Sequence, residues 1–355
     1  MSDYLPEDVL IDIFTRLPIK TLLQIRCVCK SLYALINNPS FITAHINRTI
    51  SHTNTPLLLL NYHIDKKEHY SIHCDDKTFV ECTVCHSSIS YLRVVGSCNG
   101  LICLSDDIHG YTDLIILWNP AIDKSVTLTF ASDSHECVLG FGFDSRANDY
   151  KVVRIVYLHD SFESEVDVYE LSTGLWRSIG TAAPLYHMIL CHLSHVFVNG
   201  ASHWIAIEEN RYLILSFDMG SEVFKEIMLP SSISNGNKLK LSVARFGESL
   251  SLFHYGEEEL IWMTSKSCCI WVMKEYGVVS SWTKLFTVGL RGISKVLGFR
   301  KTGEVLVGMG NGELVSYDPK SKKVVFTGIC GYRSPFHLDT YVESLVLLGR
   351  KKLKS

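Results

Sequence analysis

The stretch CTVCH, residues 82–86, combines residue types and a spacing that can hold haem or a metal. Cys-x-x-Cys-His is the pattern of covalent c-type haem attachment, and Cys-x-x-Cys beside histidines forms half of many zinc sites. A zinc ion needs two further ligands, and the chain has no second Cys-x-x-Cys and no His-x-His. The candidates near the motif are His73, Cys74, His86 and Cys98. We therefore expect no metal and no cofactor, and we interpret Cys82 and Cys85 as buried or partly exposed thiols.

Other reactive residue types give no catalytic pattern. Cys268 and Cys269 are adjacent in a predicted strand, so their side chains point to opposite faces and cannot chelate one ion together. Gly308 to Gly312 resembles a phosphate loop but precedes a strand and not a helix, which favours a turn. No nucleophile elbow, HExxH motif or acidic metal cluster occurs. We assign no catalytic residue and expect a protein that is not an enzyme, although a triad assembled in space from the 15 histidines stays open.

Composition predicts a folded protein without a large positive surface. Of the 355 residues, 47% are hydrophobic and 20% are charged, which is enough to build a sizeable core. The net charge of −3 gives no broad field for a polyanion such as nucleic acid. The start MSDYLPEDVL lacks the regions of a secretory signal, and PLLLL is too short to cross a membrane. We expect a cytoplasmic and/or nuclear protein with no nucleic-acid or membrane partner, whose 12 cysteines remain thiols.

The N-terminal part of the chain predicts short helices. Leu5-Pro6-Glu7-Asp8 places a proline and two acids at a helix start, and apolar residues then recur at helical spacing until Pro18. A second helix is predicted over 19–30, and Asn38-Pro39 predicts the start of a last short helix through Ile46. A bundle of this size buries only about 60% of its surface. Some of its apolar surface must therefore dock, either on the rest of the chain or on a partner.

The remainder of the chain alternates short apolar runs with turn residues at a regular period. Turn pairs recur at steps of roughly fifty residues, and four strands per repeat of this length are typical of a β-propeller blade. The turn pairs are Asn99-Gly100, Asn148-Asp149, Asn199-Gly200, Gly247-Glu248 and Gly303-Glu304. A sixth, weaker blade is predicted from LLLLNY, HYSIHC and TFVECTV, completed by the C-terminal run TYVESLVLL, which would tie the ends of the ring together. We predict a mainly β chain: a short α-helical head followed by a propeller of about six four-stranded blades.

One aromatic residue of each legible repeat occupies the same position in its predicted blade. These residues are Trp118, Tyr169, Phe217, Trp271 and Tyr317. Equivalent positions in successive blades face the neighbouring blade, so we expect them to pack between blades and not to bind a ligand.

The helical segment LPEDVLIDIFTRLPIKTLLQIRCVCKSLYALINNPSFI closely resembles the F-box, over residues 4 to about 46. Leu32 departs from the family pattern, which usually has tryptophan there, so weaker packing is expected at this position. Further along, GSCNGLICL, WNPA, VDVYELSTGLWRSI and YVESLV resemble the plant F-box-associated domain, which is classed near kelch-type propellers. The resemblance implies an F-box domain over 1–49, a propeller-like substrate-recognition domain over 50–348 and a basic tail over 349–355.

This resemblance implies the non-catalytic substrate-recognition subunit of an SCF-type E3 ubiquitin ligase. The F-box would bind a Skp-family adaptor, and through it a cullin and a RING subunit, while the propeller binds an unknown protein substrate. S-locus F-box proteins, which recognise secreted ribonucleases, are one group whose sequence pattern this chain resembles. The alternative is a propeller scaffold that acts without ubiquitin transfer. The predicted adaptor-binding set, shared with the helical core, is Leu5, Pro6, Val9, Ile13, Phe14, Leu17, Pro18, Leu22, Ile25, Val28 and Leu32.

The sequence does not identify the substrate-binding residues. Propellers bind partners through loops at one face, and the least periodic connectors are 105–113, 158–165, 180–188 and 255–267. The second and the fourth contain clusters of acidic residues, which weakly favours a basic partner.

Overall fold

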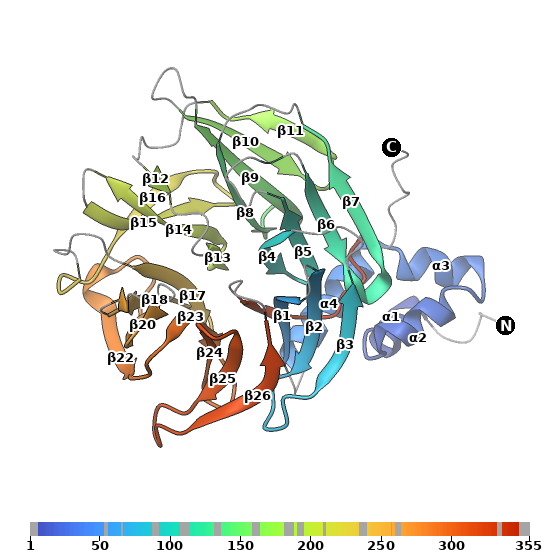
Figure 1. The fold of residues 1–355 in the computed structure, drawn as a ribbon. Coiled ribbons are helices and arrows are strands. Elements are labelled where there is room, and N and C mark those ends of the chain that lie inside the picture. Colours follow the sequence, from blue (N-terminus) through green and yellow to red (C-terminus); the bar gives the residue numbers. More distant parts are fainter. Residues whose placement is uncertain are drawn as a thin grey trace.

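The computed structural model consists of a small α-helical head joined to a ring of β-sheets (Figure 1). It describes residues 6–52, 56–64, 67–86, 92–106, 112, 114–130, 136–157, 164–180, 188–189, 195–208, 211–233, 240–256, 258–259, 264–331 and 336–347. Within these residues six sheets surround a common axis, each forming one blade of a propeller, and no helix is long and apolar enough to span a bilayer. The predicted fold class is confirmed.

The head contains α1 (Glu7–Phe14), α2 (Ile19–Ile25), α3 (Lys30–Ile36) and α4 (Pro39–His52). Pro6 and Pro18 precede α1 and α2 in extended conformations, where a missing N–H removes no helical hydrogen bond. The Asn38 side chain accepts a hydrogen bond from the backbone at the start of α4. The predicted helix over 19–30 is wrong in one respect, because Cys29 is extended and separates α2 from α3. Helix α4 continues to His52, beyond its predicted end.

Each blade arranges its strands side by side from the axis outward. Blade 1 contains β27 (His337–Tyr341), β1 (Leu57–Ile64), β2 (Lys67–Cys74) and β3 (Glu81–His86). Blade 2 contains β4 (Arg93–Cys98), β5 (Leu101–Ser105), β6 (Ile115–Asn119) and β7 (Lys124–Leu128), with the 3₁₀ helix η2 (Pro120–Ile122) before β7. Blade 3 contains β8 (Cys137–Asp144), β9 (Asp149–Tyr157), β10 (Ser164–Glu170) and β11 (Leu175–Ser178).

Blades 4 to 6 follow the same plan with additional short elements. Blade 4 contains β13 (His195–Val198), β14 (Ala201–Glu208), β15 (Arg211–Asp218) and β16 (Phe224–Met228), and β12 (Met188–Ile189) also pairs with β14. Blade 5 contains β17 (Leu241–Phe246), β18 (Ser249–Tyr255), β21 (Cys268–Met273) and β22 (Trp282–Val288), with η3 (Val279–Ser281) before β22. Blade 6 contains β23 (Ile293–Phe299), β24 (Val305–Met309), β25 (Glu313–Tyr317) and β26 (Val324–Cys330), and β19 (Glu258–Glu259) is attached through β20 (Thr264–Ser265) to β23.

The ring closes where β27 pairs with β1, from Tyr341 opposite Leu57 to His337 opposite Asn61. A C-terminal closing strand was predicted, but from the run TYVESLVLL, residues 340–348. Only the first two residues of that run belong to β27, so its predicted position is wrong. Residues 342–347 instead leave the sheet and reach the helical head, where apolar side chains are needed.

The predicted turn pairs connect the first strand of a blade to the second. Asn99 and Gly100 have φ of 49° and 82°, and Asn199 and Gly200 have φ of 52° and 77°. These values are typical of two-residue type I′ hairpins, which asparagine and glycine tolerate best. Because the blades are antiparallel, these turns and the third-to-fourth-strand turns share one end of the ring, which we call the hairpin face. The second-to-third-strand connectors and the connectors between blades lie at the other end, the loop face.

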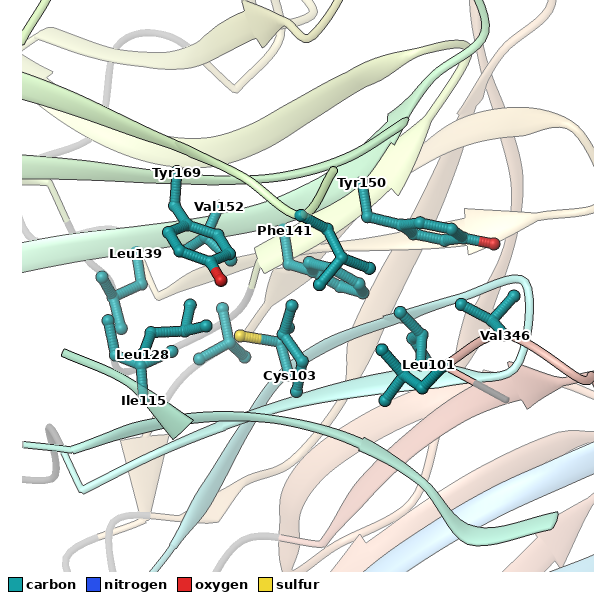
Figure 2. Packing of buried hydrophobic residues seen from close by; sticks show 14 of the residues in the cluster. Leu101, Cys103, Ile115, Leu128, Leu139, Phe141, Tyr150, Val152, Tyr169 and Val346 are labelled. Carbon is teal, nitrogen blue, oxygen red and sulfur yellow. The ribbon is translucent and has the colours of Figure 1, made fainter. Parts of the chain in front are cut away.

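Buried side chains between neighbouring blades hold the ring together. Figure 2 shows Leu101, Cys103 and Ile115 of blade 2 packed against Leu139, Phe141 and Val152 of blade 3. Full burial of one such large apolar side chain stabilises a fold by about 1.5–3 kcal/mol. The aromatic residues predicted to pack between blades all lie in clusters shared with a neighbouring blade, which confirms that prediction: Trp118, Tyr169, Phe217, Trp271 and Tyr317.

Candidate functional site

The helical head has a small core of its own. Leu22 and Ile36 are completely buried, and Phe41 is 2% exposed. These residues pack against Leu345, which comes from the C-terminal segment after β27. Leu22 belongs to the predicted adaptor-binding set, and the structure places it inside the head. Its side chain therefore stabilises the head and does not form the head's surface.

Other members of the predicted adaptor-binding set form part of the surface. Val9 and Ile13 are 40% and 42% exposed, and they share one face of α1 because they are one helical turn apart. Val28, between α2 and α3, is 73% exposed. Apolar side chains exposed together are typical of protein interaction sites. Pro6 and Pro18 are also exposed, Phe14, Leu17, Ile25 and Leu32 are half-buried, and Leu5 lies outside the described residues.

Tyr33 is a surface residue of the head that was not predicted. It is 51% exposed on α3, and the Arg26 guanidinium carbon lies 4.9 Å from the centre of its ring. It follows Leu32, which is half-buried at the position where tryptophan is usual in the family. The helical period of α3 contains part of the signal, because Tyr33 is two positions from the buried Leu35 and therefore lies on nearly the opposite side of the helix.

The head docks on the hairpin face of blades 2 and 3. Ile42 and Ile46 of α4 pack on the core between these blades, and Ile122 of η2 packs on the core of the head. The Asn148 side-chain amide, at the turn between β8 and β9, lies 3.4 Å from the Thr43 hydroxyl. One side of the head is thus covered by the protein's own propeller, while the side with Val9 stays exposed. The loop face lies at the opposite end of the ring.

Asn119 joins the C-terminal segment to blade 2. Its side chain is completely buried, and its Nδ2 donates to the carbonyl oxygens of Ser344 at 2.9 Å and Val346 at 2.8 Å. Its Oδ1 accepts a hydrogen bond from the Ala121 N–H at 3.0 Å and so begins η2. The segment is therefore fixed between the propeller and the head, with Leu345 in the head's core.

We predict that Asn119→Ala will loosen the C-terminal segment. The substitution leaves the carbonyl oxygens of Ser344 and Val346 without this donor, and each buried unpaired polar group costs about 1–3 kcal/mol. Hydrogen exchange followed by mass spectrometry should show faster exchange over 342–347, with no change in blade 5. Asn311→Ala, which removes an exposed asparagine from a surface turn, is the matched control. Unchanged exchange over 342–347 would contradict the role given to Asn119.

A channel of about 270 Å³ lies on the axis of the ring, lined mainly by the innermost strands β27, β4, β13, β17 and β23. Near its loop-face end four basic side chains stand at or near the start of their strands: Arg93, His195, Lys295 and His337. Asp339 and Arg245 lie nearer the hairpin face. Burial raises the pKa of the Asp339 carboxyl to about 6, although Arg245 and the Ser97 N–H, 3.1 Å away, oppose this shift. None of these residues was predicted from the sequence.

The four least periodic connectors all belong to the loop face. Connectors 105–113, 158–165 and 255–267 join the second to the third strand of their blades, and 180–188 joins blade 3 to blade 4. Most of their residues lie outside the described part of the chain. The described residues that flank them, such as Ser105, Tyr157 and Cys268, are at the loop-face ends of their strands. The topology therefore brings these connectors to one end of the ring, opposite the docked head.

The CTVCH motif lies in β3, the outer strand of blade 1. Its Cys82 Sγ lies 2.9 Å from the Sγ of Cys74 on β2. Two other proposed ligands are engaged elsewhere, since His73 pairs with the Ser71 hydroxyl at 2.8 Å and Cys98 ends β4 in blade 2, while the side chain of His86 lies outside the described part of the chain. Among the described side chains, no three of His, Cys, Asp and Glu gather where a metal ion could bind.

We predict that Cys74 and Cys82 will form a disulfide under mild oxidation. Their sulfur atoms are already close, and a disulfide bond is about 2.05 Å long. Burial and the neighbouring Cys74 raise the pKa of Cys82 to about 11, so the bond should form faster as the pH rises towards 9. Oxidised glutathione supplies the oxidising equivalents and leaves as two reduced molecules, and non-reducing peptide mapping detects the cross-link. Exposed Cys330 is the control and should stay uncrosslinked. Alkylation of both Cys74 and Cys82 after oxidation would contradict this.

The fold is that of a chain with a small helical head and a six-bladed propeller. Residues 3–43 match the F-box domain, and residues 48–348 match the F-box associated beta propeller domain. The chain belongs to the family of F-box proteins with an F-box associated propeller.

The chain is similar in sequence to F-box proteins of a plant. The chain is 30% identical to the F-box protein CPR1 of Arabidopsis thaliana, over 97% of this chain and 89% of that protein. It is 27% identical to the F-box/WD-40 repeat-containing protein 1 of the same plant, over 83% of this chain and 71% of that protein. The crystal structure of TolB from Acinetobacter baumannii is similar in fold, with a TM-score of 0.51 at 9% identity over 85% of this chain and 72% of TolB.

Proposed function

We propose that this protein is the substrate-recognition subunit of an SCF-type ubiquitin ligase, acting in the cytoplasm or nucleus. The F-box head binds a Skp-family adaptor, and the adaptor connects it to a cullin and a RING subunit. The propeller binds the protein to be ubiquitinated. Members of the F-box family generally act as substrate adaptors and not as enzymes, which supports this role.

The observation that carries the proposal is the division of surfaces on the head and the ring. Val9 and Ile13 are exposed on the side of the head that does not dock on the propeller. The loop face, with the least periodic connectors, is at the far end of the ring from the hairpin face on which the head docks. Two partners can therefore bind at once without sharing a surface.

Such a subunit catalyses no reaction itself and acts by holding the substrate in position. Holding a substrate near the ubiquitin-charged conjugating enzyme turns an encounter in solution into one within a complex, which raises the effective concentration of the reacting groups. The fixed contact between head and propeller serves this role, because a stiff connection limits the volume that the bound substrate explores. Leu345 and Asn119 supply part of that stiffness.

Co-expression with a Skp-family adaptor, followed by size-exclusion chromatography, tests the proposal. We expect a one-to-one complex that also retains a cullin and a RING subunit. Addition of ubiquitin, the activating and conjugating enzymes and ATP should then modify proteins captured by the propeller. A monodisperse chain that does not bind the adaptor would contradict the proposal and favour a propeller scaffold that acts without ubiquitin transfer.

A further inference from the structure

The loop-face end of the axial channel gathers basic side chains from four strands. Arg93 begins β4, His195 begins β13, His337 begins β27, and Lys295 is close to the start of β23. All four line the same channel. The pKa of His337 is lowered mainly by burial and further by the nearby charges of Lys295 and Arg93. Burial lowers the pKa of His195 and of His337 to about 3, so both imidazoles are uncharged at neutral pH. The positive charges at this entrance are those of Lys295 and Arg93, which repel one another.

Lys295 is central to this group. It makes no hydrogen bond or ion pair with any described residue. Burial, and then the charge of Arg93, lower the pKa of its ammonium to about 8, so the group is mostly charged at neutral pH. Two carboxylates line the same channel: Glu68 accepts a hydrogen bond from Asn61 at 2.8 Å and Asp339 accepts one from the Ser97 N–H, and neither forms an ion pair with Lys295. An anion entering the channel would relieve the repulsion and gain a charge-assisted hydrogen bond.

His195, which also lines the channel, adds a second polar group. Its side chain is nine-tenths buried, and its Nδ1 lies 2.8 Å from the Val95 carbonyl oxygen, so Nδ1 must carry the hydrogen that is donated there. Its Nε2 is then an acceptor, and it has no hydrogen-bond partner among the described residues. This atom can accept a bond from an N–H or O–H of the ligand. A ligand that offers both an anionic group and a donor, as a peptide segment or a phosphate monoester does, therefore fits the channel better than a bare anion.

The connectors that lead into the channel-lining strands share the same charge bias in the sequence. These connectors are residues 87–92, 179–194, 229–240, 289–292 and 331–336, and none contains Asp or Glu although the chain has 37 of them. They contain Lys238, Lys240, Arg291 and Arg333 instead. The acidic clusters lie in second-to-third-strand connectors such as 158–165, whose ends are farther from the axis. In the sequence, the connectors that lead into these five strands thus lack acidic residues, whereas 131–136, which leads into β8, contains Asp133 and Glu136.

We propose that the loop-face end of the axial channel binds an anionic group, a phosphate or a carboxylate, carried by a segment of the protein substrate. The inference rests on the proposed function, since it specifies which part of the substrate the propeller recognises. The channel of about 270 Å³ holds one such side chain and is slightly smaller than the roughly 300–1,000 Å³ of pockets for drug-sized ligands.

Binding of defined peptides to the full chain tests the proposal. The probe is a labelled peptide with phosphoserine between pairs of lysines, compared with the same peptide carrying serine or glutamate, and with inorganic phosphate. Fluorescence anisotropy at fixed ionic strength should show binding of the phosphoserine or the glutamate peptide and at least tenfold weaker binding of the serine peptide. Lys295→Ala should weaken binding at least tenfold and Lys295→Arg should retain it. Lys225→Ala, which removes an exposed lysine of β16, should leave it unchanged.

The results distinguish failure of this inference from failure of the proposed function. Equal affinity of Lys295→Ala and the wild type for the anionic peptide overturns the inference, and so does equal affinity of the three peptides. Phosphate that stabilises the chain through Lys295, without any peptide binding, overturns the assignment to a protein substrate. Adaptor binding is measured in parallel and should be the same for all variants. Loss of adaptor binding by the wild type itself would contradict the proposed function and leave the anion site intact.

Discussion

Replacing Val9 and Ile13 together by aspartate will weaken binding to a Skp-family adaptor at least 100-fold. The two side chains are 40% and 42% exposed on one face of α1, so their replacement costs little in the free protein. In a complex the new carboxylates would be buried without partners, and truncating or disrupting central interface residues typically costs about 2–4 kcal/mol each. Isothermal titration with the purified adaptor measures the loss, and circular dichroism checks that the head stays folded.

A matched control lies on the propeller. Val324 and Phe326 of β26 are also apolar and 40% and 51% exposed, but they are on the outer strand of blade 6. Replacing this pair by aspartate adds the same charge and should leave adaptor affinity unchanged. A Val9/Ile13 double variant that binds the adaptor as tightly as the wild type would show that α1 is not the adaptor surface.

Lys151→Met will destabilise the propeller by about 3–5 kcal/mol, the cost of removing one partner from a buried ion pair. The Lys151 Nζ lies 2.8 Å from Asp144 Oδ2, from Glu222 Oε1 and from the Met219 carbonyl oxygen, so it connects blade 3 to blade 4. Only 5% of its side chain is exposed, and 3% of that of Asp144. Methionine has a similar shape but leaves both carboxylates without this cation. Urea unfolding at pH 7 measures the difference.

The free energy of unfolding that Lys151→Met removes depends on pH, and the direction of this dependence follows from two carboxyl pKa values. Burial alone would raise the pKa of Asp144 and of Glu222, but hydrogen bonds, from Lys151 to Asp144 and from Arg177 and Lys151 to Glu222, hold both pKa values below their ordinary range. Groups with a depressed pKa stabilise the fold above their unfolded pKa and lose this contribution as the pH falls. The difference between wild type and Lys151→Met should therefore be largest above pH of about 5 and shrink in more acidic solution.

A surface ion pair provides the comparison for Lys151. Arg211 pairs with Glu208 at an exposed position, where 47% and 36% of the two side chains are accessible. Arg211→Met should cost less than about 1 kcal/mol, because solvent already screens this pair. Equal effects of Lys151→Met and Arg211→Met would contradict the role given to the buried network.

Regular features of the sequence predicted the blades well. The turn pairs, such as Asn99-Gly100, recur because blades 2 to 6 each connect their two innermost strands by a tight hairpin, and the aromatic residues recur because neighbouring blades pack on each other. The closing strand was placed too far along the chain for the same reason. TYVESLVLL is the more apolar run, but the innermost strand faces the channel and accepts polar residues such as His337 and Asp339.

The functional surfaces were harder to predict because they depend on what each residue faces. The head is apolar on several sides, one facing its core, one the propeller and one solvent, so helical period alone could not separate Leu22 from Val9. Lys295 and His195 were missed because a single polar residue in an apolar strand resembles an ordinary outward-facing residue. Only the circular arrangement of the blades brings these side chains to one axis.

The C-terminal segment makes complete folding of both the head and the ring depend on synthesis of the last part of the chain. The ribosome completes the F-box first, yet the core of that head includes Leu345, and the first blade lacks its innermost strand until residues 337–341 have been made. A chain that stops before residue 337 has an incomplete head core as well as an exposed edge on β1, and such defects are recognised by chaperones and proteases. The last described residues of the chain therefore complete both the propeller ring and the core of the F-box head.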